Sequence, residues 1–378
     1  MKITFISNYL NHHQIPFSNA MYDLLGGEYR FVATAPMGQE RAELGYKNMD
    51  GNPYEIKSYA LKEDLKYCYS LADTSDVVII GSAPDSFIAD RLKEGKLTFK
   101  YAERFYKTGT SLRKLPRHFI GAWMHHGRFQ KYPLYMLCAS AYTAGDAARF
   151  GNYLGRCYKW GYFPETRHYD LDSLFQKKKS STLLWAGRLI DWKHPEYAVE
   201  AAARLQRDGY TFELNMIGSG VMENELRAMI AEKQLEDVVH LLGAMPPEKV
   251  REHMEQASIF LFTSDRQEGW GAVLNESMNS GCAVVACSAI GSVPFLLRNG
   301  ENGSTYPVGD FETFYARLKM LLDDSEQRER CGRAAYRTIT ETWCAEVAAE
   351  RLLTLAECLK KGEDTPFADG PCSKAENW

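Results

Sequence analysis

The sequence lacks several features that would define whole classes of protein. None of its 378 residues form an apolar run near the ~18 residues that a membrane-spanning helix needs. The first eight residues turn polar too soon for a signal peptide and instead predict a β-strand. The nine cysteines are odd in number and form no Cys-x-x-Cys pair. These absences favour reduced, mostly buried thiols and a cytoplasmic protein.

A strong excess of either charge is also missing. The chain carries 45 Lys and Arg against 49 Asp and Glu, so its net charge is -4. This near-neutral total gives no reason to expect nucleic acid as a partner. Apolar residues at 45% and charged residues at 25% exclude a disordered or fibrous chain. The length fits two domains of roughly 150 to 200 residues.

One segment departs from this balance. Residues 91–131 contain eleven Lys and Arg but only two acidic residues, interleaved with aromatic residues. A basic surface with aromatics suits an anionic membrane face, so a peripheral position on the inner membrane face is a further expectation. A solvated helix face with buried aromatics explains the pattern equally well, and nucleic-acid binding is a weaker interpretation.

Short β-rich runs alternate with helical patterns, which is typical of α/β domains with parallel sheets. The predicted strands are residues 2–7, 29–34, 76–81, 134–140, 157–160, 182–186, 212–217, 238–241, 259–263 and 283–286. Residues 195–206 predict a helix with one buried stripe. The predicted organisation is a domain over 1–165, a linker over 166–181, a domain over 182–343, a helix over 344–362 that packs back on the first domain, and a loose tail over 363–378.

Two motifs follow predicted strands of the second half. The stretch 264–276 places Glu268 in a glycine-containing loop and Glu276 in the helix after it. Carboxylates so placed can grip the hydroxyl groups of a sugar and a ribose, although an isolated pair is more often surface charge. Arg188 and Lys193 follow another strand and fit a diphosphate, and Gly218-Ser219-Gly220 forms a third turn.

Together these motifs resemble the donor half of the family-4 glycosyltransferases, which have the GT-B fold. The context after Glu276 matches as well, through Gly281 to Asn302-Gly303, and the resemblance covers roughly residues 182–342. It implies an α/β protein with two facing Rossmann-like, doubly wound parallel-sheet domains and an interdomain cleft. It also implies a retaining, hexosyltransferase-like enzyme that uses a nucleotide-diphosphate sugar, a UDP-sugar first, with no metal and no cofactor.

The resemblance also implies a role for each matching residue. Arg188 and Lys193 would hold the diphosphate, Glu268 would hold hydroxyls of the transferred sugar, and Glu276 would bind the ribose. Leu242 and Gly243 would lie near the base, and the backbone amides around Gly269, Trp270, Gly271 and Ala272 would meet the phosphate and sugar. The remaining implied donor-binding residues are Gly187, Gly218 and Gly220.

The first half departs from the family pattern, because its first strand is not followed by a glycine-rich loop. His12, His13 and Gln14 occupy that place and are candidate acceptor-side residues. In the alternative interpretation Asn11 caps a helix and the histidines are solvated. Asp170-Leu171-Asp172 has the form of a metal motif, but it lies in the predicted linker, and we expect it to have a surface role.

The expected function is sugar transfer to a glycan or lipid-linked acceptor in surface polysaccharide synthesis. Two alternatives stay open: a nucleotide-sugar epimerase of the same fold, and a non-catalytic nucleotide-sugar-binding subunit. A dehydrogenase is disfavoured, because no Gly-x-Gly-x-x-Gly follows the first strand.

Overall fold

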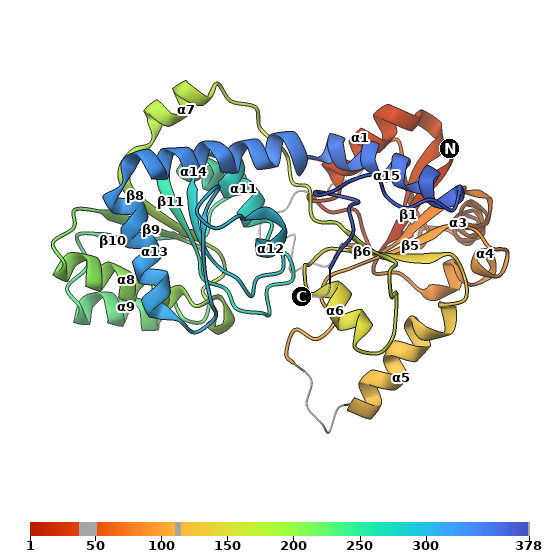
Figure 1. Ribbon diagram of the computed structural model, residues 1–378, viewed down its shortest axis with the longest axis horizontal. Coiled ribbons are helices and arrows are strands. Elements are labelled where there is room, and N and C mark those ends of the chain that lie inside the picture. The colour runs from red at the N-terminus through yellow and green to blue at the C-terminus, as the bar shows by residue number, and fades with distance from the viewer. Residues whose placement is uncertain (38–50, 110–114, 377–378) are drawn as a thin grey trace. The chain divides into compact units, whose positions relative to one another are not determined.

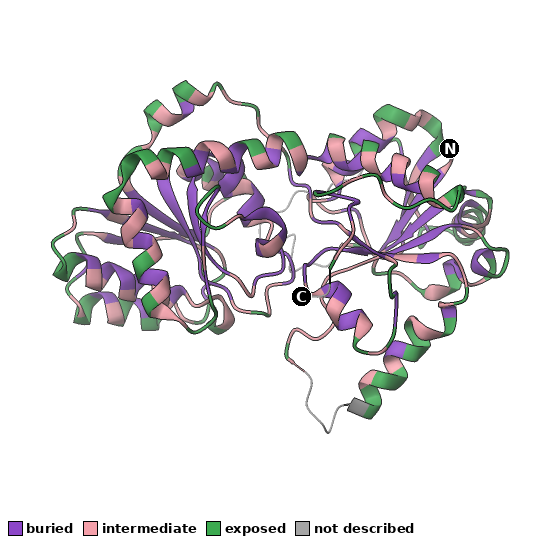
Figure 2. Cartoon of the chain, in the orientation of Figure 1, coloured by how far each residue is buried: buried purple, intermediate pink, exposed green. Residues whose placement is uncertain are grey.

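The computed structural model describes residues 1–37, 51–109 and 115–376. The chain divides into two compact units, each with its own parallel sheet (Figure 1). Unit 1 comprises Met1–Glu165 and Trp343–Trp378, and unit 2 comprises Thr166–Thr342. Buried residues run along the strands of both sheets (Figure 2). Each unit therefore has a core of its own, and each is described by itself.

The sheet of unit 1 has the order β3-β2-β1-β4-β5-β6-β7, with every neighbouring pair parallel. Its strands are β1 (Ile3–Ser7), β2 (Tyr29–Ala33), β3 (Glu55–Lys57), β4 (Val77–Ile80), β5 (Thr98–Ala102), β6 (Leu134–Cys138) and β7 (Cys157–Lys159). The central strand β4 consists of Val and Ile alone, and all four of its residues are buried. Such an unbroken apolar run is typical of a parallel strand covered on both faces.

The helices of unit 1 are α1 (Ile15–Leu25), α3 (Lys62–Thr74), α4 (Ala89–Lys93), α5 (Leu115–His125), α6 (Thr143–Ala148) and α15 (Ala345–Lys360). The short 3₁₀ turns are η1 (Gly26–Glu28), η2 (Asp85–Phe87) and η4 (Gly127–Phe129). Helix α15 packs against α1, although more than 300 residues separate them in the sequence. The C-terminal helix thus belongs to the same unit as the N-terminus.

The segment expected to be a loose tail is instead part of the unit 1 sheet. The Lys159 amide donates to Ser373, and the Cys372 and Ala375 amides donate to Lys159 and Cys157. The bridge from Tyr158 to Lys374 is antiparallel, and Cys372 is fully buried. The expectation was wrong because these residues satisfy the edge of β7, a role that leaves no periodic pattern in the sequence. Asn377 and Trp378 lie outside the described residues.

The sheet of unit 2 has the order β10-β9-β8-β11-β12-β13. Its strands are β8 (Lys179–Ala186), β9 (Glu213–Ile217), β10 (Val239–Gly243), β11 (Ala257–Phe262), β12 (Ala283–Cys287) and β13 (Ser304–Tyr306). Its helices are α7 (Leu171–Lys177), α8 (Pro195–Arg207), α9 (Glu223–Glu232), α10 (Pro247–Gln256), α11 (Val273–Asn279), α12 (Val293–Leu296), α13 (Phe311–Asp323) and α14 (Ser325–Arg337), with turns η5 (Asp191–Lys193) and η6 (Thr338–Thr342). Helix α8 buries Ala198, Ala201, Ala202 and Leu205, the stripe predicted from their spacing.

Three strands were missed, and the predicted linker was wrong. Strand β3 has three residues, two of them charged, β5 lies inside the basic segment, and β13 is also only three residues long. Residues 166–181 contain α7 and the start of β8, and they belong to unit 2. Asp170 accepts a hydrogen bond from the Ser173 amide and so caps α7, a signal hidden in the Asp-x-Asp motif.

In both sheets the strand order reverses beside the first strand. In unit 1 this place lies between β1 and β4, and in unit 2 it lies between β8 and β11. Ligands of doubly wound sheets bind beyond the carboxyl ends of the strands at such a place. All nine cysteines are free thiols. Among the described helices, none combines the length and the apolar character needed to cross a bilayer.

Candidate functional site

Two side chains from different loops meet beyond the carboxyl ends of β8 and β11. The Lys193 ammonium lies 2.6 Å from Oε2 of Glu268, and each side chain is only 13% exposed. The Ser264 hydroxyl donates to the same carboxylate oxygen at 3.1 Å. Low exposure strengthens this charge-assisted pair relative to a surface ion pair. The structure therefore brings together two of the three predicted catalytic residues.

The two loops are joined by a short hydrogen-bond chain. The Trp185 indole N–H donates to the Thr263 hydroxyl at 2.8 Å, and that hydroxyl donates to the Lys193 carbonyl at 2.6 Å. The Asp265 amide donates to the Trp192 carbonyl at 2.9 Å. Because β8 and β11 are adjacent strands, these bonds fix the Lys193 backbone against the loop that carries Glu268.

The predicted glycines are brought together by backbone contacts. The Gly187 amide donates to Ile217, and the Gly218 amide donates to Gly243. A Cβ atom on Gly218 would lie 1.8 Å from the Gly187 carbonyl oxygen, and one on Gly220 would lie 2.2 Å from the Leu189 carbonyl oxygen. The chain therefore approaches too closely for any side chain at these two positions. The turn after β9 buttresses the loop that carries Arg188 and Lys193.

Arg188 is exposed on this loop, and its guanidinium carbon lies 5.8 Å from the centre of the Trp192 ring. The Lys193 ammonium lies 5.0 Å from the same ring. Within the described residues no carboxylate lies in ion-pair range of Arg188, so its charge remains available to an anion. The loop thus offers one paired cation and one exposed cation at the same sheet edge.

The segment between Glu268 and α11 depends on one more glycine. Gly271 has φ +83°, and a Cβ there would lie 2.4 Å from the Phe262 ring. The Trp270 side chain is fully buried, and its indole donates to Asn275 at 2.9 Å. Because the Trp270 side chain is part of the core, only the backbone of this residue can contact a ligand. Gly269 is buried and Ala272 precedes the first residue of α11.

Glu276 lies in α11, one helical turn after Ala272. Burial raises the pKa of the Glu276 carboxyl, while the positive charges of Arg251 and Arg167 act in the opposite direction. The Arg251 guanidinium donates to Asn279 at 2.6 Å, three residues further along the chain. The carboxyl of Glu276 therefore lies in a desolvated place near two cations, unlike an ordinary solvated helix residue.

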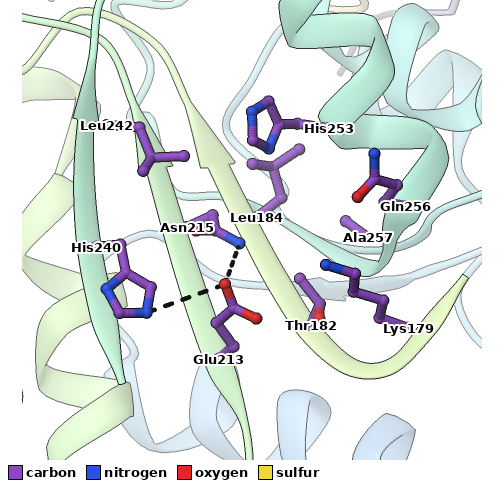
Figure 3. A pocket seen from close by; sticks show the side chains of 10 residues that line it. All are labelled: Lys179, Thr182, Leu184, Glu213, Asn215, His240, Leu242, His253, Gln256 and Ala257. Carbon is purple, nitrogen blue, oxygen red and sulfur yellow. Dashed lines mark hydrogen bonds and ion pairs between the residues drawn. The ribbon is translucent and has the colours of Figure 1, made fainter. Parts of the chain in front are cut away.

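Leu242 lines a different hollow. A cavity of about 260 Å³ lies on one face of β8, β9 and β10 beside α10 (Figure 3). Its lining residues are Lys179, Thr182, Leu184, Glu213, Asn215, His240, Leu242, His253, Gln256 and Ala257. Asn215 donates to Glu213 at 3.0 Å, and His240 lies 3.9 Å from the same carboxylate. Arg188, Lys193 and Glu268 do not line this cavity, so it is distinct from the charged strand-end site.

In unit 1 the loop after β1 carries the predicted acceptor-side residues. The rings of His12 and His13 lie 3.6 Å apart, and His13 stacks on Tyr162 at 5.2 Å. Gln14 is 7% exposed and precedes α1. Asn11 accepts from the His13 amide at 3.0 Å, but it does not cap the helix, because α1 begins four residues later. The histidines are thus packed with aromatic rings rather than freely solvated.

The basic segment 91–131 is only partly a surface. Arg91 is fully buried and donates to backbone carbonyls, and Lys100 lies 2.7 Å from Asp85. Phe99 and Phe129 belong to the core. Exposed cations in the segment include Arg117, Arg128 and Lys131, whereas Arg113 and Lys114 lie outside the described residues.

A second cavity, of about 490 Å³, lies beneath α5. Its lining includes Phe105, Tyr106, Phe150, Asp146, Asn152 and, from α5 and its end, Arg117, His118, Gly121, Ala122, His125 and His126. Burial lowers the pKa of His126 to about 3, and its Nδ1 lies 3.0 Å from the Tyr153 hydroxyl. His126 is therefore neutral at physiological pH.

Several residues at the strand-end site were not predicted. His194 has φ +47° in the left-handed region, and its Nδ1 lies 2.8 Å from Glu196. The hydrogen bond to Glu196 raises the pKa of His194. Thr263 and Ser264 follow β11, and their position at a strand's carboxyl end was the signal available in the sequence. Across the described ranges, no cluster of three or more His, Cys, Asp or Glu side chains could hold a metal ion.

Comparison with known proteins places this site in a family context. Residues 170–338 match the family model described as glycosyl transferases group 1. The amylovoran biosynthesis glycosyltransferase AmsK of Erwinia amylovora is 34% identical over 144 residues, which are 37% of this chain and 35% of that protein. The N-acetylgalactosamine-N,N'-diacetylbacillosaminyl-diphospho-undecaprenol 4-alpha-N-acetylgalactosaminyltransferase of Campylobacter jejuni is 32% identical over 166 residues, 42% of this chain and 44% of that protein. The chain thus spans less than half the length of these relatives.

The likeness in fold extends over nearly the whole chain. The crystal structure of HepE from Anabaena in complex with UDP has a TM-score of 0.68 and 15% sequence identity, and the match covers 96% of this chain and all of that one. The two Rossmann-like parallel sheets therefore have the GT-B fold, as the motifs of the second half implied.

Proposed function

We propose that this chain transfers a sugar from a nucleotide-diphosphate sugar to an acceptor with retention of anomeric configuration, because residues 170–338 match the family model described as glycosyl transferases group 1. One observation carries the proposal. The switch point of the unit 2 sheet holds a lysine paired with a carboxylate, in two loops that are joined by hydrogen bonds, and an exposed arginine on the lysine's loop.

The residues of this site can stabilise a departing diphosphate. Arg188 and Lys193 supply two positive charges where negative charge develops as the anomeric C–O bond breaks. Glu268 accepts hydrogen bonds from sugar hydroxyls, while Lys193 exchanges this carboxylate for the phosphate oxygens. The acceptor oxygen bonds to the anomeric carbon on the leaving-group face, and its proton passes to the departing phosphate. The chain's own cations carry this role without a metal.

The donor and acceptor follow from the chemistry of known relatives. A UDP-sugar is the first donor to test, because HepE shares the fold and was solved with UDP. A glycan or lipid-linked acceptor in surface polysaccharide synthesis is proposed, because AmsK serves amylovoran synthesis and the name of the Campylobacter relative contains a diphospho-undecaprenol. The site of action would be the cytoplasm, at the inner membrane face.

The test is incubation with a panel of nucleotide sugars, without acceptor, followed by chromatography of the nucleotide products. We expect slow hydrolysis to nucleoside diphosphate and sugar, lost in Arg188→Ala and Lys193→Ala. Lys249→Ala is the matched control, because Lys249 is a 60% exposed lysine of the same unit, paired with Glu252. An epimeric nucleotide sugar as product, or tight binding without any turnover when acceptors are added, would contradict the proposal.

A further inference from the structure

Helix α5 exposes its apolar side. Phe119, Ile120, Trp123 and Met124 are 58%, 56%, 57% and 45% exposed. Their spacing of one, four and five residues places them on one face of this 11-residue helix. A helix on the surface of a globular protein normally buries such a face, and four large apolar side chains side by side are unlike singly scattered ones. Figure 2 shows that α5 is mostly exposed.

The opposite side of α5 does not compensate for this exposure. It presents His118, Gly121 and Ala122 to the 490 Å³ cavity, and only Ala122 of these is buried. Phe119 makes one edge contact, with the ring of Phe150 at 6.3 Å. The large side chains therefore contribute little to the core of unit 1, so packing does not account for their presence.

The exposed charges on and just beyond α5 are positive. From Arg104 to Gly145 the sequence holds seven Lys and Arg and no Asp or Glu, although Arg113 and Lys114 lie outside the described residues and Glu103 and Asp146 border the range. Arg117 is exposed on α5 itself, and Arg128 and Lys131 are exposed just beyond it. Two acids of the described residues approach: Asp85, which already faces Lys100, His125 and Arg128, and Asp146, which lines the cavity and lies 3.9 Å from Arg104. An apolar strip bordered by cations is complementary to a bilayer interface, where apolar acyl chains lie beneath negatively charged headgroups.

We propose that α5 docks unit 1 on an anionic lipid bilayer, with Phe119, Ile120, Trp123 and Met124 in the acyl boundary and Arg117 among the headgroup phosphates. A second copy of the chain fits less well, because pairing this face with itself would oppose like charges. The inference rests on the proposed function only for the biological role of docking, which would bring the enzyme to a lipid-linked acceptor. Docking itself needs neither donor nor turnover.

The test is flotation at physiological salt with vesicles of phosphatidylcholine and phosphatidylglycerol at equal amounts, against vesicles of phosphatidylcholine alone. We expect wild type to float with the anionic vesicles, and the Phe119→Ser/Trp123→Ser variant to lose roughly tenfold or more in partitioning. The matched control is Leu65→Ser/Tyr67→Ser on α3, where both residues are at least 40% exposed but lie beside Glu63 and Asp64. This control should float like wild type.

Further measurements separate the possible failures. Arg117→Glu should weaken flotation several-fold, and bromine-labelled acyl chains should quench wild type more than Trp123→Phe. Equal flotation of wild type and Phe119→Ser/Trp123→Ser, or of the two vesicle types, would overturn the inference. So would a dimer in sedimentation that only this variant abolishes. Donor hydrolysis without vesicles tests the transfer proposal separately and reports that the docking variants are folded.

Discussion

The two sheets share one strand order up to the seventh strand, but their switch points hold different chemistry. In unit 2 the loops after β8 and β11 bring a lysine and a carboxylate to 2.6 Å. In unit 1 the loop after β1 stacks His13 on Tyr162 and places His12 against His13. The same scaffold therefore positions charge in one unit and aromatic surface in the other. Function follows the loops rather than the fold.

The units also differ in what the glycines of their strand-end loops contact. A Cβ on Gly81, after β4, would lie 2.9 Å from the Ser7 hydroxyl oxygen, a side-chain atom. A Cβ on Gly218 would meet a backbone carbonyl oxygen at 1.8 Å. A side chain can rotate away, whereas a carbonyl in a hydrogen-bonded loop cannot. The unit 2 site is thus held by its backbone, which is why its glycines form a recognisable motif.

The strongest test of this difference between the units is to remove the charge at the unit 2 switch point. Lys193→Met should lower donor hydrolysis and transfer roughly 100-fold to 1000-fold, because a preorganised cation no longer meets the leaving group. Glu268→Gln should raise KM for the donor as well as lower kcat, since it loses both the lysine and sugar contacts. Steady-state kinetics with each variant measure these effects. Wild-type rates in Lys193→Met would show that the charge pair is only structural.

The second test changes a glycine whose backbone contact supports the unit 2 site. Gly218→Ala should destabilise unit 2 by about 2 kcal/mol or more, because the new Cβ clashes with the Gly187 carbonyl. Gly309→Ala is the control, since Gly309 has φ +80° but open space around it. The control should cost only about 1 kcal/mol of backbone strain. Urea unfolding measures both, and equal losses would refute the close-approach argument.

The loop of unit 1 gives a weaker contrast. His12→Ala/His13→Ala should lower transfer roughly tenfold, through KM for the acceptor, while acceptor-free donor hydrolysis stays unchanged. Tyr162→Phe keeps the ring that stacks on His13, and it serves as the control for packing. If turnover with acceptor is unchanged in the double variant, these histidines have no role in the reaction.

The smallest effect concerns pH. The hydrogen bond that His194 donates to the Glu196 carboxylate raises the pKa of His194 above its unfolded value near 6.5. Its stabilising contribution is therefore complete below about pH 6.5 and is lost as pH rises through the raised, folded-state pKa. His194→Asn is the reference, because asparagine tolerates the left-handed backbone and does not titrate. As pH rises from about 6.5 through the folded-state pKa of His194, the free energy of unfolding of wild type should fall by about 0.5 kcal/mol relative to that variant. Urea unfolding at several pH values measures it, and parallel pH profiles would contradict it.

The sequence predicted unit 2 better than unit 1 for a physical reason. Gly218 and Gly220 are required by backbone contacts, and Lys193 and Glu268 by charge, so each residue type is dictated locally. Residues 372–375 pair with β7 through backbone groups alone, so the pairing requires no particular residue type that could be recognised in the sequence. Burial of Trp270 and Arg91 likewise depends on distant elements. The buried Arg91 shows why a charge count over residues 91–131 overstates a surface.

The return of the chain to its first unit sets an order of assembly during synthesis. Unit 2 is one continuous stretch, Thr166–Thr342, and can complete its sheet as soon as that stretch has left the ribosome. Unit 1 emerges first, but α1 still lacks α15, and the edge of β7 still lacks residues 372–375. Of the two units, the one whose translation begins earlier is therefore completed later, and the edge of β7 stays unpaired until residues 372–375 have emerged.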